Sequence, residues 1–212
     1  MKEVIDMELR AGDKLLAQNV SFRLEEGECV LLAGANGSGK STLMRALSGA
    51  NPSFVLVPTG IPKVRGFTLE DFLATACYRE SNWAGLLRPE TRMRIDEALH
   101  LLSLEGLRDR DLSTLSDGEF QKGCIALGLA RDAKVLLLDE PTAFLDVTNR
   151  KMVLECLAEL AKKGMTVLFS SHDIQDSLAV AHRVFAFTPS GEFLVSTKEN
   201  REDIIHAAFP TY

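Results

Sequence analysis

The stretch C-V-L-L-A-G-A-N-G-S-G-K-S-T, residues 29–42, decides the fold of this chain. Its first part, Cys29–Ala33, is an unbroken apolar run, typical of a strand buried on both faces of a parallel sheet. Residues 34–42 fit the pattern G-x-x-x-x-G-K-[ST], in which backbone N–H groups surround the phosphates of a nucleotide. Residues 41–48 then carry apolar side chains on one helical face, and we expect this helix to stop at Gly49. A strand, a glycine loop and a helix in this order predict a nucleotide-binding α/β fold.

The loop over residues 34–42, called the phosphate loop below, supplies groups that hold a triphosphate. Its glycines allow the backbone to approach the phosphates closely, and the following helix presents the positive end of its dipole. Lys40 reaches the β- and γ-oxygens as a point charge, Ser41 is the natural magnesium ligand, and Thr42 caps the helix near the α-phosphate. The nucleotide-binding residues predicted in this loop are Gly34, Asn36, Gly37, Ser38, Gly39, Lys40, Ser41 and Thr42.

Two acidic residues follow a second apolar run, V-L-L-L at 135–138. Asp139 is expected at the carboxyl end of this buried strand, where it holds magnesium directly or through water. Glu140 is expected to point at the water that attacks the γ-phosphorus, and a glutamate at this position favours a site that hydrolyses its nucleotide. The segment S-S-H-D at 170–173 closes another predicted strand, and L-S-D-G-E at 115–119 opens a predicted helix.

Together these four segments resemble the ATP-binding subunits of ATP-binding cassette (ABC) transporters, and the likeness covers most of the chain. Residues 115–119 resemble the family's signature segment. The resemblance implies that Ser116 and the N–H of Gly118 bind the γ-phosphate held by a second subunit, so that two chains face head to tail with ATP between them. Residues 143–146, A-F-L-D, resemble the family's D-loop, in which Asp146 links the two sites.

The resemblance also implies the chemistry of the site. His172 stands where the family contacts the γ-phosphate and orders the attacking water. The implied catalytic residues are Glu140, His172 and Lys40, and the implied cofactors are ATP and Mg²⁺. The expected metal contacts are Ser41, Asp139 and Thr59.

Several positions depart from the family pattern. Thr59 replaces a glutamine that touches magnesium, and its shorter hydroxyl is expected to reach the metal through water. Arg10 or Ala11 stands where an aromatic side chain normally stacks on adenine, so we expect poor discrimination between bases. In the signature segment, Asp117 and Glu119 replace the usual glycine and glutamine.

Outside these motifs the chain alternates strands and helices, with one helical interruption. Predicted strands span 5–9, 20–24, 29–33, 54–57, 135–138, 166–170, 184–187 and 193–195; predicted helices span 41–48, 70–78, 89–104, 119–131 and 149–163, with another from 173. We expect one ABC ATPase domain over 1–212: an α/β P-loop NTPase core with a mostly parallel sheet and a reduced N-terminal antiparallel β lobe (1–66 and 113–212), and an inserted all-helical subdomain (67–112). The C-terminal tail, 198–212, is weakly patterned.

Composition argues against several classes of protein. The formal net charge is −6 and no basic cluster stands out, so nucleic acid is not an expected partner. No apolar stretch approaches the ~18 residues that span a bilayer, and the N-terminus lacks the apolar core of a signal peptide. The four cysteines are far apart and form no C-x-x-C pair, and their apolar sequence neighbours indicate buried thiols in a reducing cytosol.

The segments G-F-T-L-E-D-F-L at 66–73 and E-P-T-A-F-L-D at 140–146 make the chain similar to importer ATPases of the iron-siderophore, haem and cobalamin class. That likeness implies two partners, an identical second ABC ATPase subunit and integral membrane permease subunits. It places the chain in the cytoplasm, on the inner face of the cell membrane. Residues 59–83 would form the groove that docks the permease. The candidate exposed aromatics there, which could equally fill the helical lobe, are Phe67, Phe72, Tyr78 and Trp83.

Two other functions stay open on the sequence. The chain could be a soluble ABC ATPase that acts on a non-membrane partner, as in iron–sulfur assembly. It could also be a regulatory ATP-binding module whose altered Thr59 site hydrolyses slowly. Co-purification with a permease would separate the transporter subunit from the first alternative, and a turnover assay would separate it from the second.

Overall fold

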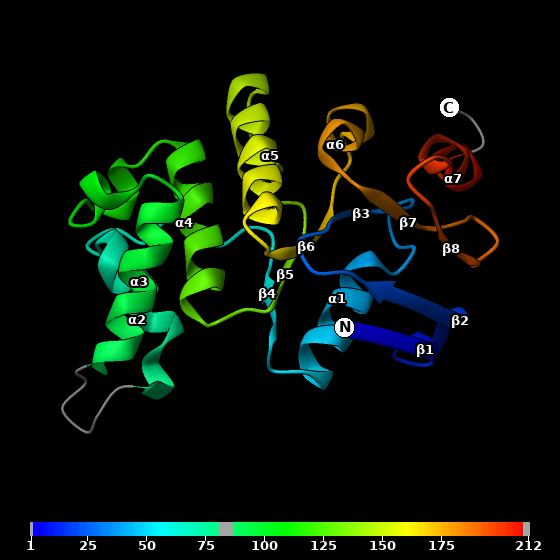
Figure 1. Ribbon diagram of the computed structural model, residues 1–212, viewed down its shortest axis with the longest axis horizontal. Coiled ribbons are helices and arrows are strands. Elements are labelled where there is room, and N and C mark those ends of the chain that lie inside the picture. Colours follow the sequence, from blue (N-terminus) through cyan, green and yellow to red (C-terminus); the bar gives the residue numbers. More distant parts are fainter. Residues whose placement is uncertain (1, 81–86, 210–212) are drawn as a thin grey trace.

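The computed structural model describes residues 2–80 and 87–209, and a six-stranded sheet forms the centre of the molecule (Figure 1). The strand order is β4-β5-β6-β3-β7-β8. These strands are β3 (Cys29–Ala33), β4 (Phe54–Val57), β5 (Val135–Leu138), β6 (Thr166–Ser170), β7 (Arg183–Phe187) and β8 (Phe193–Val195). All neighbours pair in parallel except β8, which is antiparallel to β7. The expected α/β fold with a mostly parallel sheet is confirmed.

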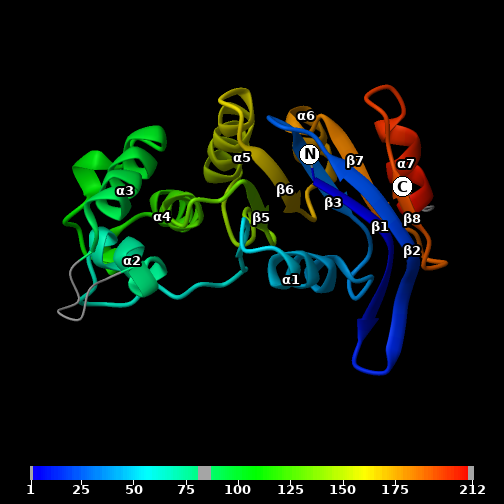
Figure 2. The same cartoon turned by 60° about the horizontal axis from the view of Figure 1, so that its bottom comes forward.

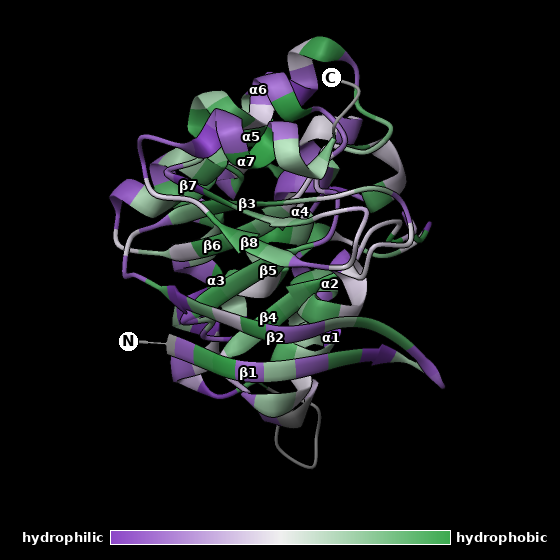
Figure 3. Cartoon of the chain, turned by 90° about the vertical axis from the view of Figure 1, so that its right-hand side faces the viewer, coloured by the Kyte–Doolittle hydropathy of each residue, from purple (hydrophilic) through white to green (hydrophobic). Residues whose placement is uncertain are grey.

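Helices cover both faces of this sheet, with α1 on one face and α5 and α6 on the other (Figures 1 and 2). The helices around the sheet are α1 (Lys40–Ala50), α5 (Val147–Lys162), α6 (Ile174–Val180) and α7 (Arg201–Ala208). Because side chains alternate along a strand, Leu31 of β3 packs with the residues of α5, whereas Val30 and Leu32 pack with those of α1. The strands therefore carry apolar side chains on both faces, and they form the apolar interior seen in Figure 3.

A separate two-stranded antiparallel sheet forms the N-terminal lobe, from β1 (Lys2–Ala11) and β2 (Lys14–Leu24). This hairpin extends beyond the central sheet in Figure 2. Phe22 anchors it, because its ring centroid lies 5.0 Å from that of Phe185 and 5.7 Å from that of Phe193. A reduced antiparallel lobe is thus confirmed. Both strands are longer than the sequence predicted, since their outer ends carry mostly exposed residues without a clear alternation.

Three helices pack together at one end of the molecule (Figure 1). They are α2 (Leu69–Ala76), α3 (Pro89–Leu101) and α4 (Asp117–Ala130), joined in part by 3₁₀ turns at Tyr78–Glu80, Glu105–Leu107 and Leu112–Thr114. α2 begins with a capping box: Thr68 Oγ1 accepts the N–H of Asp71, and the Asp71 carboxylate accepts the N–H of Thr68, both at 3.1 Å. The boundary of a helical subdomain at 67–112 stays a prediction.

One expectation about a helix was wrong, and one further helix was not predicted. α1 runs through Gly49 and is capped by Asn51 in an extended conformation, because Gly49 does not adopt the left-handed backbone that ends a helix. The tail that looked weakly patterned contains α7. That helix is held by tertiary contacts, since Arg201 donates to the carbonyl of Leu178 at 3.3 Å and Ala208 is buried.

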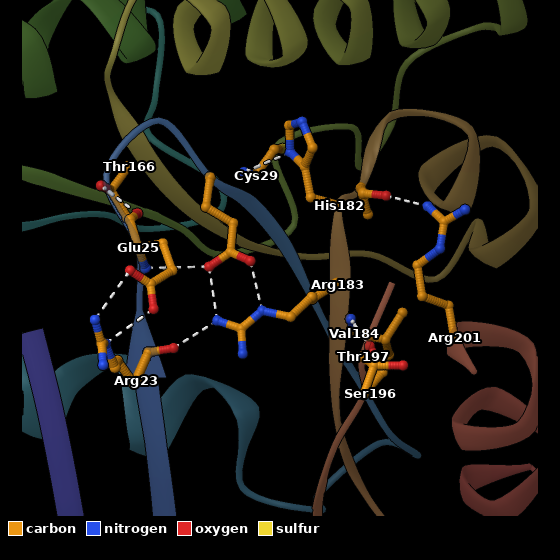
Figure 4. A network of polar contacts seen from close by, with 12 residues as sticks. Arg23, Glu25, Cys29, Thr166, His182, Arg183, Val184, Ser196, Thr197 and Arg201 are labelled. Carbon is orange, nitrogen blue, oxygen red and sulfur yellow. Dashed lines mark hydrogen bonds and ion pairs between the residues drawn. The ribbon is translucent and has the colours of Figure 1, made fainter. Parts of the chain in front are cut away.

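A polar network closes the amino-terminal edge of the sheet (Figure 4). Arg183 Nη2 donates to Glu28 Oε2 at 2.7 Å and to the carbonyl of Arg23 at 2.5 Å. His182 Nδ1 accepts the backbone N–H of Cys29 at 3.0 Å, so this ring nitrogen carries no proton. Because Glu28 is buried, Arg183 compensates a charge that would otherwise be costly there. The network ties the starts of β3 and β7 together, at the edge opposite the phosphate loop.

All four cysteines are free thiols: three are buried, and Cys156 is partly buried. This agrees with the expectation from their apolar sequence neighbours. Among the helices of the described residues, none is long and apolar enough to cross a membrane.

Candidate active site

The central strands β3, β5 and β6 are neighbours, and their carboxyl ends meet at one edge of the sheet. The parallel register pairs Leu138 with Phe169 and Leu32 with Ser170, which brings the segments after these strands together. The phosphate loop follows β3, Asp139 and Glu140 follow β5, and His172 follows β6. This edge is where open α/β sheets bind their ligands.

The phosphate loop turns tightly between β3 and α1. Gly34 has φ of 141°, and a Cβ at this position would lie 2.7 Å from Ser38 Oγ, so only glycine fits. Gly39 forms the N-cap of α1 with φ of 115° and offers no side chain that would cover the helix N-terminus. The first backbone N–H groups of an eleven-residue helix therefore face the loop, as an anion site requires.

Lys40 lies at the mouth of this loop. Its Nζ donates to the carbonyl of Gly34 at 2.7 Å and to that of Ala35 at 3.2 Å, and the side chain is buried. Burial lowers the pKa of Lys40, while the negative charges of Glu140 and Asp139 oppose this shift. The ammonium and the two carboxylates thus act on one another electrostatically, although they come from different strands.

Asp139 and Glu140 stand side by side after β5 and point to different partners. Asp139 Oδ1 accepts a hydrogen bond from Ser170 Oγ at 2.9 Å, and the residue is only 9% exposed. Glu140 has a left-handed backbone with φ of 51°, and its Oε1 lies 2.7 Å from His172 Nε2. The three catalytic residues predicted from the sequence, Lys40, Glu140 and His172, are therefore assembled at one edge.

Thr59 lies next to the same carboxylates. Its Oγ1 donates to the backbone carbonyl of Asp139 at 2.5 Å. The N–H of Asp139 in turn donates to the carbonyl of Val57 at 3.1 Å, which continues the pairing of β4 with β5. Thr59 therefore contacts the backbone of a predicted metal ligand.

The signature segment, residues 115–119, lies at the start of α4, on the helical side of the molecule (Figure 1). Ser116 forms a capping box, since its Oγ accepts the N–H of Glu119 at 3.2 Å and its own N–H donates to Glu119 Oε2 at 2.8 Å. The unusual Asp117 is paired with Lys63, whose Nζ lies 2.8 Å from Asp117 Oδ1 and donates to the carbonyl of Leu115 at 2.7 Å. Glu119 is thus part of the cap, and the extra charge of Asp117 is balanced.

Gly118 of the signature segment packs closely against α5, the helix that follows the D-loop. A Cβ at Gly118 would lie 2.3 Å from Asn149 Oδ1, so α4 approaches the first turn of α5 closely. Asp146 caps α5 by accepting the N–H of Asn149 at 2.8 Å. Arg150 in the same turn lies 2.7 Å from Asp173, the residue after His172. The first turn of α5 therefore contacts both the signature segment and the segment that carries His172.

The residues of this edge fit ATP and Mg²⁺. The Ser38 hydroxyl is buried and has no hydrogen-bond partner among the described residues, although it lies in the loop that would surround phosphate oxygens. A hydroxyl from Ser41 and a carboxylate from Asp139 are hard oxygen donors of the kind that Mg²⁺ prefers. Mg²⁺ commonly uses one or two protein ligands and takes the rest from phosphates and water.

Sequence reasoning missed two residues near these segments, Ser170 and Lys63. Ser170 ends β6, and the predicted pairing of parallel strands could have placed it beside Asp139. Lys63 has no such signal, because it lies in an irregular segment and meets Asp117 only through the folded chain.

The aromatic residues expected on a docking surface divide into two groups. Phe67 and Tyr78 are 42% and 74% exposed. Phe72 follows the other interpretation left open by the sequence and fills the helical lobe: it faces inward from α2 and packs on Phe120 of α4 with ring centroids 5.8 Å apart. Trp83 lies outside the described residues.

Comparison with known proteins agrees with this geometry. The family model described as ABC transporter matches residues 17–54 and 58–143. The cobalt import ATP-binding protein CbiO of Rhodobacter capsulatus is 34% identical over 207 residues, which cover 87% of this chain and 74% of the relative. The petrobactin import ATP-binding protein FpuC of Bacillus anthracis is 32% identical over 197 residues, which cover 82% and 72%.

A solved structure of a metal-chelate type ABC transporter in an inward-facing conformation superposes with a TM-score of 0.82. It is 26% identical and matches 97% of this chain and 86% of that one. The resemblance that the four motifs indicated is thereby confirmed. The chain belongs to the ABC transporter family and is an ATPase of that family.

Proposed function

We propose that this chain is the ATP-hydrolysing subunit of an importer for a metal chelate, and that it pairs with a second copy and drives membrane permease subunits. The observation that carries the enzymatic part is the meeting of Lys40, Asp139 and the Glu140–His172 pair at one sheet edge. The import part is supported by relatives whose names specify cobalt and petrobactin import.

In this proposal the phosphate loop binds the triphosphate. Lys40 places its ammonium at the loop mouth, where it faces the β- and γ-oxygens, and the N-terminus of α1 adds its backbone N–H groups. Other binding residues of the loop are Gly34, Asn36, Gly37, Ser38, Gly39, Ser41 and Thr42.

Ser41 and Asp139 would hold Mg²⁺, which neutralises charge on the phosphates when bound. Thr59 acts mainly through the backbone of Asp139, because its hydroxyl proton is used in the bond to that carbonyl. Glu140 accepts a proton from the attacking water, and His172, 2.7 Å from its carboxylate, holds the side chain in place and faces the γ-phosphate.

A second copy of the chain completes the site from outside. Ser116 and the N–H of Gly118 at the start of α4 would contact the γ-phosphate bound by the partner. Two exposed apolar side chains lie near Asp146 in the sequence: Phe144 of the D-loop, which is 93% exposed, and Val147 at the start of α5, which is 60% exposed. Their burial against the second copy would stabilise the pair, since exposed apolar patches of this kind mark interaction sites.

The permease would dock near α2. A shallow groove of about 300 Å³ lies there, lined in part by Phe67, Asp71, Ala74 and Tyr78. Val64, nearby in the sequence, is 45% exposed. These residues lie within the segment that the family resemblance implies for the permease contact, and binding there would hold the chain at the cytoplasmic face of the membrane.

The proposal is tested by expressing the chain with the permease encoded beside it and purifying the complex from membranes. We expect co-purification, ATP hydrolysis that depends on Mg²⁺, and ATP-dependent uptake of a metal chelate by vesicles that contain the complex. The chain could instead hydrolyse ATP and be recovered with a soluble partner and no permease. That result would favour a soluble ABC ATPase over an importer subunit. No ATP hydrolysis with any partner would contradict the enzymatic proposal.

A further inference from the structure

Ser170 contacts both residues of the carboxylate pair. It is the last residue of β6, and its side chain is fully buried. Its hydroxyl donates to Asp139 Oδ1 at 2.9 Å and accepts the backbone N–H of Glu140, also at 2.9 Å. We propose that Ser170 is a positioning residue, whose single hydroxyl fixes the Asp139 carboxylate and the backbone of Glu140 together. This inference rests on the proposed function, which assigns Asp139 to the metal and Glu140 to the attacking water.

The directions of the two hydrogen bonds are determined by their chemistry. A backbone N–H can only donate, so Ser170 Oγ must accept from Glu140. The hydroxyl has one proton, and geometry directs it at Asp139 Oδ1, which accepts the hydrogen bond. Ser170 thereby occupies Oδ1 and leaves Oδ2 of Asp139 for the metal, because none of the described residues makes a hydrogen bond to Oδ2.

The bond to Glu140 matters because the backbone of Glu140 is strained. Its φ of 51° lies in the left-handed region, where the Cβ of a non-glycine residue crowds the backbone. The N–H of Glu140 donates to Ser170 and its carbonyl accepts the N–H of Ala143 at 3.1 Å, so both backbone groups are satisfied in this conformation. This conformation places the Glu140 carboxylate 2.7 Å from His172. Without Ser170 the N–H of Glu140 would lose its acceptor.

The pairing of β5 with β6 brings Ser170 beside the carboxylate pair. Leu138 and Phe169 are paired in register, so Asp139, which follows β5, and Ser170, which ends β6, lie side by side. Ser177 of α6 offers a contrast, because it is equally buried but its hydroxyl has no hydrogen-bond partner among the described residues. Buried serine hydroxyls in this chain are therefore not all bonded, and the two bonds of Ser170 distinguish it.

The test compares Ser170→Thr with Ser170→Val. The two replacements have nearly the same volume and differ in the hydroxyl group. Ser170→Ala removes the hydroxyl without adding volume, and it is compared with wild type. This variant keeps the test valid if the larger valine prevents folding. Ser177→Ala is the matched control, because it removes a buried hydroxyl that makes no bond.

Three quantities are measured on folded protein. They are the turnover rate with Mg²⁺ and ATP, the gain in affinity for a non-hydrolysable ATP analogue when Mg²⁺ replaces EDTA, and the hydrogen-exchange rate of the Glu140 amide. Residues that orient metal ligands typically change metal affinity or activity by about 10–100-fold when removed. We expect the Val and Ala variants to lose about that factor in turnover and in the Mg²⁺-dependent gain, and to exchange the Glu140 amide faster. Affinity in EDTA should not change, since the phosphate loop is intact.

The Thr variant and Ser177→Ala are expected to behave like wild type in all three measurements. Equal values for the Thr and Val variants, or wild-type values for the Ala variant, would overturn the role of Ser170. If wild type itself does not hydrolyse ATP, the proposed function fails, but the amide exchange and the Mg²⁺-dependent affinity still decide whether Ser170 positions the pair.

Discussion

His172 Nε2 lies 2.7 Å from Glu140 Oε1, although the two residues follow different strands of the sheet. The contact depends on the left-handed backbone of Glu140, which turns its side chain toward β6. It joins the residue expected to accept a proton from water to the residue expected to face the γ-phosphate. The first prediction concerns this pair.

Glu140→Gln should keep nucleotide binding and abolish turnover, because the amide cannot accept a proton from water. General-base catalysis contributes about 10²–10⁴-fold, so a loss of at least about a hundredfold in turnover rate is expected. Unhydrolysed ATP should then hold two copies together, and size-exclusion chromatography with ATP and Mg²⁺ should show a dimer. Normal hydrolysis by this variant would remove Glu140 from its assigned role. Lys162→Gln is a suitable control, because the exposed Lys162 forms an ion pair with neighbouring Glu159 on the surface of α5.

The chain should discriminate weakly between ATP and GTP. Arg10, at the position expected for a base-stacking aromatic, is exposed and paired with Glu8 in the hairpin. Neither Arg10 nor Ala11 offers an aromatic ring that would hold the base in a fixed orientation, so we expect binding to depend mainly on the phosphates and magnesium, which ATP and GTP share. The affinities for the two nucleotides, measured by isothermal titration calorimetry, should differ by less than about a hundredfold. A larger preference for ATP would mean that another group reads the base.

Gly128→Ala should destabilise the fold, because α4 passes close to the sheet at this residue. An added Cβ would lie 2.4 Å from Leu136 Cδ1 and 3.1 Å from Val57 Cγ2. Overpacking of this kind costs about 1–3 kcal/mol, which a urea titration detects. Gly49→Ala is the control, since nothing lies within 4 Å of its added Cβ and alanine favours the helix. Equal stability of Gly128→Ala and wild type would contradict the close packing of α4.

Two buried thiols should make stability fall in alkaline solution. Burial raises the pKa of the Cys29 thiol and that of the Cys124 thiol from 9.0 to about 12. The contribution of these two protonated thiols to the free energy of unfolding is fully present below pH 9.0. It declines as the pH rises toward about 12, because unfolded thiols ionise in this range while folded ones keep their protons. The slope is about 1.4 kcal/mol per pH unit for each thiol.

This pH effect is measured from urea unfolding at pH 8 and pH 10. Other groups titrate in the same range, so the Cys124→Ala variant supplies the control. Its free energy of unfolding should fall less steeply with pH than that of wild type, and the difference in slope is the contribution of the Cys124 thiol. Both thiols should also resist a thiol reagent at pH 8 in the folded protein. Rapid labelling of Cys29 or Cys124 at pH 8, or equal slopes for variant and wild type, would contradict their burial.

Most of the central fold was predictable because its strands and helices are recognised from the pattern of apolar and polar residues that are consecutive in the sequence. The strand before the phosphate loop, the helix after it and the strand before Asp139 are each recognised from consecutive residues. The cap at Thr68 was predictable for the same reason, since its partner Asp71 lies three residues away. The site followed from the general rule that parallel strands present their carboxyl ends at one edge.

The sequence left the structure undecided where a residue's neighbours are distant along the chain. Phe72 has the same local context whether it is exposed or packed on Phe120, and only the packing of α2 on α4 decides between these. α7 is short and weakly patterned, and it forms because Arg201 reaches the carbonyls that end α6.

The sequence alone determined that a buried strand, a glycine loop and a helix follow one another, and it predicted a triphosphate site there, because those motifs depend on backbone conformation and on residues that are close in the chain. The tertiary structure decided how Ser170 holds Asp139 and Glu140, and how Lys63 balances Asp117. Hydrogen bonds and ion pairs act over a few ångströms in space. Their partners are therefore defined only when strands β5 and β6, or the segment around Lys63 and α4, have been brought together by the fold.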